Sequence, residues 1–268
     1  MKSSFIELPE GEIHCLTFGI GPELLIALHG FSDRARIFAV LEPALSENYT
    51  VVAIDLPFHG QTTWNPDTFS KENLLEIIQR ILAEHKKERF SLMGFSFGGR
   101  LAQALLPDLV DKMNKLYLLS PDGVKTKGMS MAVRTPMWMR HFLNRLLQNP
   151  IWFIALLNAG RRIRLVPPLI HHFLTNNLNR PERYRRAFGC WLSMRYFYLR
   201  RRNIKRILNE SHLRTDVYIG LSDPMLRQKT LKKLFEGLQD VRVFWLDDGH
   251  RLIGEELCEH LKDNVIIG

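Results

Sequence analysis

Cysteine is scarce in this chain. Only three of the 268 residues are cysteines, Cys15, Cys190 and Cys258, and they stand far apart. An odd number at wide spacing matches neither a disulfide framework nor a zinc-binding pattern, and it is typical of proteins kept in a reducing compartment. We expect all three to be buried as small apolar side chains.

Long apolar runs are also missing. The longest stretch, IWFIALLNA from Ile151, is about half of the roughly 20 residues that a membrane-spanning helix needs. The first residues, MKSSFIELPEGEIHC, lack the apolar core of a signal peptide. Hydrophobic residues nevertheless make up 46% of the chain, enough to bury a large core. Composition therefore predicts a soluble, cytoplasmic, globular protein.

Acidic residues are nearly absent from one long segment. Between Lys125 and Arg214 lie 19 of the 37 lysines and arginines, but only two of the 28 aspartates and glutamates, Glu182 and Glu210. The rest of the chain holds the other 18 basic and 26 acidic residues. The net charge of +9 thus belongs to a basic insert in a mildly acidic body.

Outside the insert, short apolar runs alternate with helical patterns. We expect strands in SFIEL, EIHCLTF, ELLIALHGF, YTVVAIDLPFHG, ERFSLMGFS, NKLYLLSPDG, TDVYIGLSD and VRVFWLDDGH. Helical spacing marks RIFAVLEPALSE, SKENLLEIIQRILAEHKK, GRLAQALLPDLV, LRQKTLKKLFEGLQ and EELCEHLKDNVI. Strands separated by helices predict an α/β fold whose central sheet is mostly parallel.

The insert contains helical patterns and no obvious strand. They are MAVRTPMWMRHFLNRLLQN, IWFIALLNAGRRIR, PLIHHFLTNNL and one long helix, PERYRRAFGCWLSMRYFYLRRRNIKRILNE. Prolines stand where such helices begin or break. A set of helices inserted between two strands of one sheet is typical of a lid. We therefore predict a core of residues 1–123 and 212–268 with an all-helical cap at residues 124–211.

A serine lies between glycines at the point where a predicted strand ends and a predicted helix begins. Gly94, Ser96 and Gly98 fit the pattern G-x-S-x-G, which in this context forms a nucleophile elbow. The strained turn needs small neighbours close to its backbone. An isolated pentapeptide of this kind is usually only a turn, and the flanking strand and helix favour the nucleophile.

A serine hydroxyl needs a base, and the base needs an orienting acid. His250 follows a strand in LDDGHRLI, and Asp223 follows the preceding strand in VYIGLSDP. Both stand at carboxyl ends of parallel strands, where open α/β sheets build their sites. Asp122 in LLSPDG competes for the role of the acid. We favour Asp223, because a turn role explains Asp122.

The tetrahedral intermediate needs hydrogen-bond donors. We assign the backbone N–H of Phe97, which follows the nucleophile, and that of Phe31 in LHGF. His29 of the same segment is a candidate substrate-binding residue, and shaping the loop is the other explanation for it.

These motifs together resemble the α/β-hydrolase-fold superfamily with a helical cap. LHGF, DLPFHG, GFSFGG, LSDP and DGHRL match the family's landmarks in order and approximate spacing, over nearly the whole chain. Phe58 departs from the usual D-x-P-G-H-G pattern and makes that loop bulkier. The resemblance implies a carboxylesterase-like serine hydrolase that works through an acyl-enzyme, with no metal or organic cofactor. A serine nucleophile argues against the dehalogenase and epoxide hydrolase branches, which attack with a carboxylate.

Three other interpretations fit the same motifs. The segment GFSFGGR is also similar to the menaquinone-pathway SHCHC synthases, lyases in which an arginine placed like Arg100 follows the elbow. Carbon–carbon bond hydrolases share the elbow and the cap. An exposed helix charge is the alternative explanation of Arg100. A catalytically silent member of the fold, which binds a small molecule or a partner, would keep the same landmarks.

The basic cap has several explanations. The simplest is the solvated face of amphipathic helices. An anionic or amphiphilic acyl substrate, or peripheral contact with a membrane, would also use its charge. We expect no nucleic acid partner, because no recognition motif accompanies the arginines.

Overall fold

The computed structural model describes residues 1–122, 150–166, 168, 171–172, 175, 186, 189–190, 192–193, 196–224, 232 and 234–264. By its internal contacts the chain forms two compact units. The first unit comprises residues 1–124 and 196–268, and the second unit comprises residues 125–195. The contacts therefore group residues 196–211 with the first unit, whereas the sequence boundaries place them in the cap.

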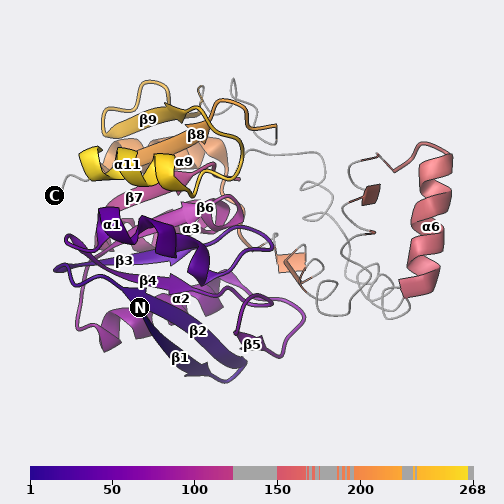
Figure 1. Cartoon of the computed structure of the whole chain (residues 1–268), viewed down its shortest axis with the longest axis horizontal. Helices are drawn as coiled ribbons and strands as arrows, with labels where there is room; N and C mark the ends of the chain where they lie inside the picture. The colour runs from indigo at the N-terminus through magenta and orange to yellow at the C-terminus, as the bar shows by residue number, and fades with distance from the viewer. Residues whose placement is uncertain are drawn as a thin grey trace. The chain divides into compact units, whose positions relative to one another are not determined.

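One nine-stranded sheet organises the first unit (Figure 1). Eight strands follow the order β1-β2-β4-β3-β6-β7-β8-β9, and β5 pairs with β2. The bounds are β1 Lys2–Leu8, β2 Gly11–Phe18, β3 Glu23–Leu28, β4 Tyr49–Ile54, β5 Thr63–Trp64, β6 Phe90–Phe95, β7 Met113–Leu119, β8 Arg214–Gly220 and β9 Val241–Leu246. β2 runs antiparallel to β1, β4 and β5, and every pair from β4 to β9 is parallel. The predicted mostly parallel sheet is confirmed.

Helices cover both faces of this sheet. η1 (Ala35–Leu41), α1 (Glu42–Leu45) and α11 (Glu255–Asn264) contact one another on one face. α3 (Phe97–Leu109), which continues into η2 (Val110–Lys112), contacts α2 (Lys71–Glu84) and α9 (Arg201–Ser211) on the other. Successive strand residues point to opposite faces, and those of β3 are apolar on both. Leu25 and Ala27 therefore join the core cluster that includes η1 and α11, while the alternate residues are buried on the other face.

Two helix starts show how local sequence sets the boundaries. α2 begins at a capping box, because the Ser70 hydroxyl accepts from the Asn73 N–H and the Asn73 side chain accepts from the Ser70 N–H. The single helix predicted in RIFAVLEPALSE is instead the 3-10 helix η1 followed by one turn of α1. Pro43 has no N–H to continue the preceding turn, and the new helix begins one residue before it, at Glu42.

The long helix predicted over residues 181–210 is interrupted. Residues 196–200 form a turn and an extended segment, and α9 begins only at Arg201. The ring of Phe197 is buried, with its centroid 4.9 Å from that of Phe69. Burial of two aromatic rings stabilises this break, a tertiary effect that helical periodicity does not reveal.

In the second unit, α6 (Pro150–Arg162) agrees with the helix predicted from Ile151. The helix predicted in MAVRTPMWMRHFLNRLLQN lies outside the described residues, as do most of PLIHHFLTNNL and half of LRQKTLKKLFEGLQ.

All three cysteines are buried, as predicted. Burial raises the pKa of the Cys15 thiol to about 12, so this thiol stays protonated near neutral pH. Among the described residues, no group of histidine, cysteine and carboxylate side chains is arranged to hold a metal ion. A helix of the length and apolarity that a membrane crossing requires is likewise not found in the described parts of the chain.

Candidate active site

Ser96 lies in the turn between β6 and α3. Its torsion angles, φ 49° and ψ −110°, are in a region that residues with a side chain rarely adopt. The Ser96 N–H donates to the Leu119 carbonyl at 2.9 Å, and the Ser96 carbonyl accepts from the Asp122 N–H at 2.9 Å. Hydrogen bonds from β7 and the segment after it therefore hold the strained turn in place.

Glycines allow the close backbone approach that the elbow requires. A Cβ atom at Gly98 would overlap the carbonyl of Leu28 at the end of β3. A Cβ atom at Gly94 would lie 2.6 Å from the Gly98 carbonyl oxygen. A larger residue at either position would push α3 away from the sheet and move Ser96.

His250 and Asp223 complete a chain of hydrogen bonds that starts at Ser96. His250 Nε2 lies 2.9 Å from Ser96 Oγ, and His250 Nδ1 lies 2.7 Å from Asp223 Oδ2. The Asp223 side chain is fully buried, and that of His250 is 19% exposed. An ionised carboxylate only accepts hydrogen bonds, so Nδ1 carries the proton and Nε2 accepts from the serine hydroxyl. The structure thus brings the three residues together.

The loops after β8 and β9 bring Asp223 and His250 to the same place. The two strands pair in parallel up to Gly220 and Leu246. Beyond this point the Ser222 N–H donates to the Asp248 carbonyl at 3.0 Å. A Cβ atom at Gly220 would overlap the Gly249 carbonyl, so the end of β8 packs directly on the loop that carries His250.

Asp122 pairs with Arg100 and not with His250. An Arg100 Nη2 to Asp122 Oδ2 ion pair joins α3 to the segment after β7. Arg100 is only 4% exposed, so the expectation of a charge on the helix surface is wrong. The guanidinium stabilises the chain next to the elbow, and the competing acid is occupied by it.

Two histidines anchor the loop that carries Phe31. His29 is fully buried, donates from Nδ1 to the Gly30 carbonyl at 2.7 Å, and accepts at Nε2 from the Leu56 N–H at 3.0 Å. His59 Nε2 accepts from the Ser32 N–H at 3.2 Å. Because both ring nitrogens of His29 bond to backbone, this residue shapes the loop. Sequence reasoning missed His59, although it stands in the DLPFHG landmark.

Phe31 and Phe97 lie on segments that leave neighbouring strands. β3 pairs with β6, with Leu28 opposite Gly94, so the Phe31 loop and the elbow start side by side. Phe97 is the first residue of α3, and the first amides of a helix have no partner within it. The ring of Phe31 packs edge-on against His59, with centroids 6.0 Å apart.

Phe58 stands where the family pattern has glycine, and the structure shows how its side chain is accommodated there. Its φ is 72°, in the left-handed region that favours glycine. The Phe58 ring lies 6.3 Å from that of Phe69, and this aromatic contact offsets part of the backbone strain.

Asp33 is a carboxylate near His250 that no sequence motif indicated. Its side chain is 14% exposed, and its Oδ1 lies 3.8 Å from the Arg251 guanidinium. Burial raises the pKa of Asp33, and the positive charges of Arg251 and of a protonated His250 oppose that rise. A partly buried acid therefore lies within electrostatic reach of the imidazole.

Comparison with known proteins agrees with this architecture. A family model described as the alpha/beta hydrolase fold matches residues 23–154. MGS-M2, an alpha/beta hydrolase enzyme from a deep-sea metagenome, superposes with a TM-score of 0.70 at 13% identity, covering 99% of each chain. This protein has the α/β-hydrolase fold. A thermophilic esterase from Thermogutta terrifontis has the same fold, with a TM-score of 0.69 at 16% identity over 99% of this chain and 97% of that one.

Curated relatives match this chain over part of their length. The human serine hydrolase-like protein is 33% identical over 131 residues, 45% of this chain and 64% of that protein. A fluoroacetate dehalogenase from Burkholderia is 29% identical over 147 residues, 52% of this chain and 48% of that enzyme. The chain thus spans less than two thirds of these relatives.

Proposed function

We propose that this protein is a serine hydrolase that cleaves a carboxylic ester or a related acyl substrate, with Ser96 as the nucleophile. The observation that carries the proposal is the pair of hydrogen bonds from Ser96 Oγ to His250 and from His250 to the buried Asp223. The positive φ angle of Ser96 also supports the proposal, because strained backbone conformations are frequent at functional sites.

In the proposed reaction the same residues act in both the acylation step and the deacylation step. Ser96 Oγ attacks the substrate carbonyl while its proton moves to His250 Nε2, and Asp223 stabilises the imidazolium. The N–H groups of Phe31 and Phe97 donate to the oxyanion. His250 then protonates the leaving alcohol, and the acyl group stays on Ser96. Water, deprotonated by His250, attacks the acyl carbonyl, and the imidazolium returns the proton to Ser96 Oγ as the acid leaves. These steps need neither a metal nor an organic cofactor.

The test is a series of p-nitrophenyl esters from acetate to palmitate, with wild type and Ser96→Ala. We expect the substitution to lower kcat/KM by at least about 10³-fold, because residual catalysis would come from binding and the oxyanion donors alone. Ser4→Ala, in β1, serves as the matched control and keeps full activity. Failure to find Ser96-dependent turnover at any acyl length would remove the esterase proposal.

A fluorophosphonate separates the hydrolase from a silent member of the fold. An activated Ser96 forms a covalent adduct, and an unactivated serine does not. Labelling without ester turnover would leave the nucleophile in place and redirect the search to other substrates.

Carbon–carbon bond hydrolysis is the second candidate reaction. A 2-hydroxy-6-oxononadienedioate/2-hydroxy-6-oxononatrienedioate hydrolase from Cupriavidus pinatubonensis is 29% identical over 157 residues, 55% of this chain and 53% of that enzyme. Ser96-dependent cleavage of such a dienedioate would favour this reaction over ester hydrolysis. The SHCHC synthase-like lyase has less support, because the pairing of Arg100 with Asp122 accounts for the arginine that suggested it.

A further inference from the structure

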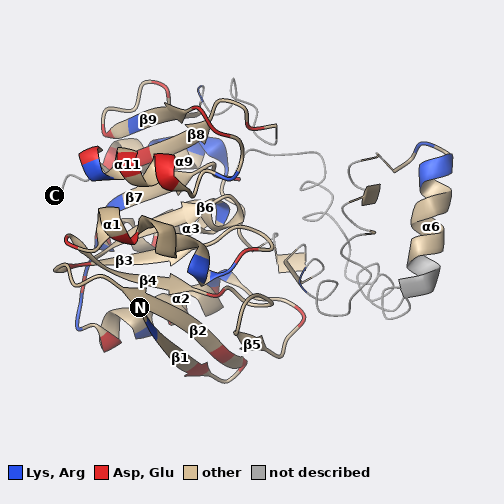
Figure 2. Ribbon diagram, in the orientation of Figure 1, with Lys and Arg blue, Asp and Glu red and all other residues tan. Residues whose placement is uncertain are grey.

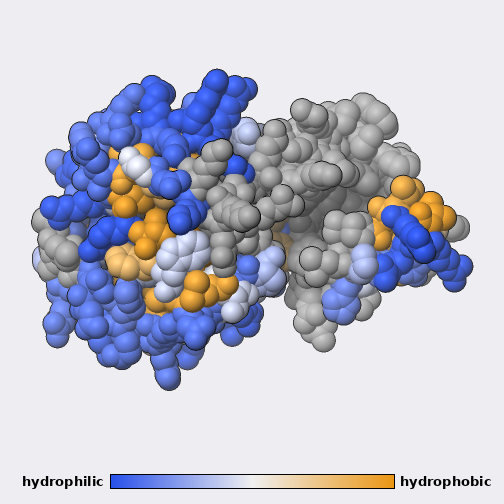
Figure 3. Space-filling view, turned by 90° about the horizontal axis from the view of Figure 1, so that it is seen from above, coloured by the Kyte–Doolittle hydropathy of each residue, from blue (hydrophilic) through white to orange (hydrophobic). Residues whose placement is uncertain are grey.

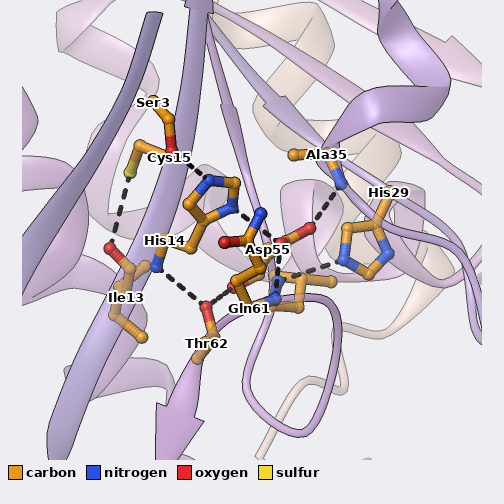
Figure 4. Close-up of polar contacts among 10 residues, drawn as sticks. Ser3, Ile13, His14, Cys15, His29, Ala35, Asp55, Gln61 and Thr62 are labelled. Carbon is orange, nitrogen blue, oxygen red and sulfur yellow. Dashed lines mark hydrogen bonds and ion pairs between the residues drawn. The ribbon is translucent and has the colours of Figure 1, made fainter.

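A second serine–histidine–aspartate arrangement lies outside the site described above. Ser3 is in β1, His14 is in β2, and Asp55 follows β4 (Figure 4). Ser3 Oγ lies 2.7 Å from His14 Nε2, and His14 Nδ1 lies 2.7 Å from Asp55 Oδ2. The residue types, the ring nitrogens and the distances match those of Ser96, His250 and Asp223.

Asp55 fixes the proton positions in this second arrangement. Its Oδ2 also accepts from the Gln61 N–H at 2.8 Å, and its Oδ1 accepts from the Ala35 N–H at 2.6 Å. Since all three contacts are to donors, the carboxylate acts only as an acceptor and the proton of the His14 pair sits on Nδ1. His14 Nε2 is then oriented to accept the hydroxyl proton of Ser3.

The base and the acid are shielded, whereas the serine is accessible. His14 is 4% and Asp55 is 2% exposed, while Ser3 is an exposed residue. Phe5 is opposite His14 in the β1–β2 ladder, and its ring centroid lies 5.2 Å from that of the imidazole. Ser3 is two residues from Phe5, so its side chain is on the same face of β1 and an electrophile can reach it from solvent.

We propose that Ser3 is a second activated serine, a modification site that forms a covalent ester with electrophilic acyl or phosphonyl compounds. Ser3 Oγ attacks the electrophilic carbon or phosphorus, and its proton passes to His14 Nε2. The leaving alkoxide or fluoride departs, and the imidazolium returns the proton to it or to solvent. Ser3 lies in a regular strand and not on an elbow before a helix, so the adduct accumulates once per chain and is not turned over.

The experiment uses the full-length Ser96→Ala protein and a fluorophosphonate. Trypsin releases residues 3–34 as one peptide, in which fragment ions distinguish Ser3 from its neighbour Ser4. Ser4 is the internal control, since it shares the strand but points to the other face, away from His14. We expect Ser3 to be labelled on the order of 10²-fold faster than Ser4.

Two further measurements keep the test decisive. His14→Gln should reduce labelling of Ser3 to the level of Ser4. If that variant does not fold, labelling in guanidinium serves instead, because unfolding removes the His14 contact and should abolish the difference. Equal labelling of Ser3 and Ser4 in the folded protein, or an unchanged Ser3 rate in a folded His14→Gln protein, would overturn the proposal. Because Ser96 is replaced by alanine in this protein, labelling of Ser3 is judged without any contribution from the proposed nucleophile.

Discussion

Asp33 and Arg251 place opposite charges near the imidazole of His250. A negative charge near an imidazole favours its protonated form, and a positive charge disfavours it. The raised pKa of Asp33 also has a consequence for folding. The folded protein holds that proton more tightly than the unfolded chain, so the stabilising contribution is present at low pH and is lost as pH rises through the raised pKa.

Asp33→Asn should therefore change the pH dependence of stability. The Tm of the variant minus the Tm of wild type should increase from acidic to neutral pH. Asparagine stays uncharged, whereas Asp33 ionises as pH rises and its partly buried charge destabilises the folded protein.

Arg251→Gln is the matched control for the sign of this effect. It removes a positive charge that lowers the pKa of Asp33, so the stability lost between acidic and neutral pH should become larger than in wild type. If this loss, measured as the change in Tm with pH, became smaller instead, electrostatic action on Asp33 would be wrong and a change in loop geometry would replace it.

Some of the proposed site could be predicted residue by residue. Ser96 and His250 stand in local motifs next to strand ends, and such motifs can be recognised from the sequence alone. The choice between Asp223 and Asp122 depends on which carboxylate meets the imidazole, and the burial of Arg100 depends on the segment after β7. Ser3 and His14 meet only through the register of β1 and β2, for which no motif exists.

At the scale of single elements, α6 combines apolar and basic side chains on its exposed surface. Leu156, Ile163 and Leu165, on the helix or just beyond it, are 57%, 67% and 76% exposed. Arg161 and Arg162 lie in its last turn, where Figure 2 shows basic residues. In the space-filling view, apolar and hydrophilic residues adjoin on the same surface of α6 (Figure 3). Such a combination suits the interface of an anionic membrane.

We predict that the protein sediments with vesicles containing phosphatidylserine at low salt and much less with phosphatidylcholine alone. Replacing Leu156, Ile163 and Leu165 together by serine should remove most of this binding, because the apolar anchor is lost. Ile20→Ser is the matched control, since Ile20 is 93% exposed but lies in the first unit. No sedimentation of wild type with the anionic vesicles would exclude the membrane contact.

The strands and long helices were predictable because their burial leaves a local pattern. β3 and β6 are continuous apolar runs since both their faces are covered. β5, with two residues, is too short to show a period. The break before α9 exists because Phe197 packs on Phe69, and this contact joins residues far apart in the chain.

At the scale of the whole molecule, every residue of the proposed reaction belongs to the first unit. Its nine strands and its core cluster also lie there. The basic insert, by contrast, supplies all of the second unit. We propose that the insert acts as a lid that selects the acyl substrate, while the core carries the chemistry.

Replacing residues 125–195 by a short glycine–serine linker tests this division. We expect the shortened protein to keep a cooperative unfolding transition and fluorophosphonate labelling of Ser96, because the sheet and the triad residues remain. Discrimination between short and long acyl chains should be lost. Aggregation or non-cooperative unfolding of the shortened protein would show that the first unit depends on the second.

The wide separation of Ser96 and His250 has a consequence for protein synthesis. The two residues that form the 2.9 Å hydrogen bond are 154 positions apart in the chain. At about 5–20 residues per second, the ribosome makes Ser96 roughly 8 to 30 seconds before its base. A nascent chain would therefore carry an inert serine at the elbow until β8 and β9 have been added. Covalent labelling of Ser96 would then report chains in which β9 and the loop that carries His250 have been made and have folded, and pulse-labelled cells could be used to time that event.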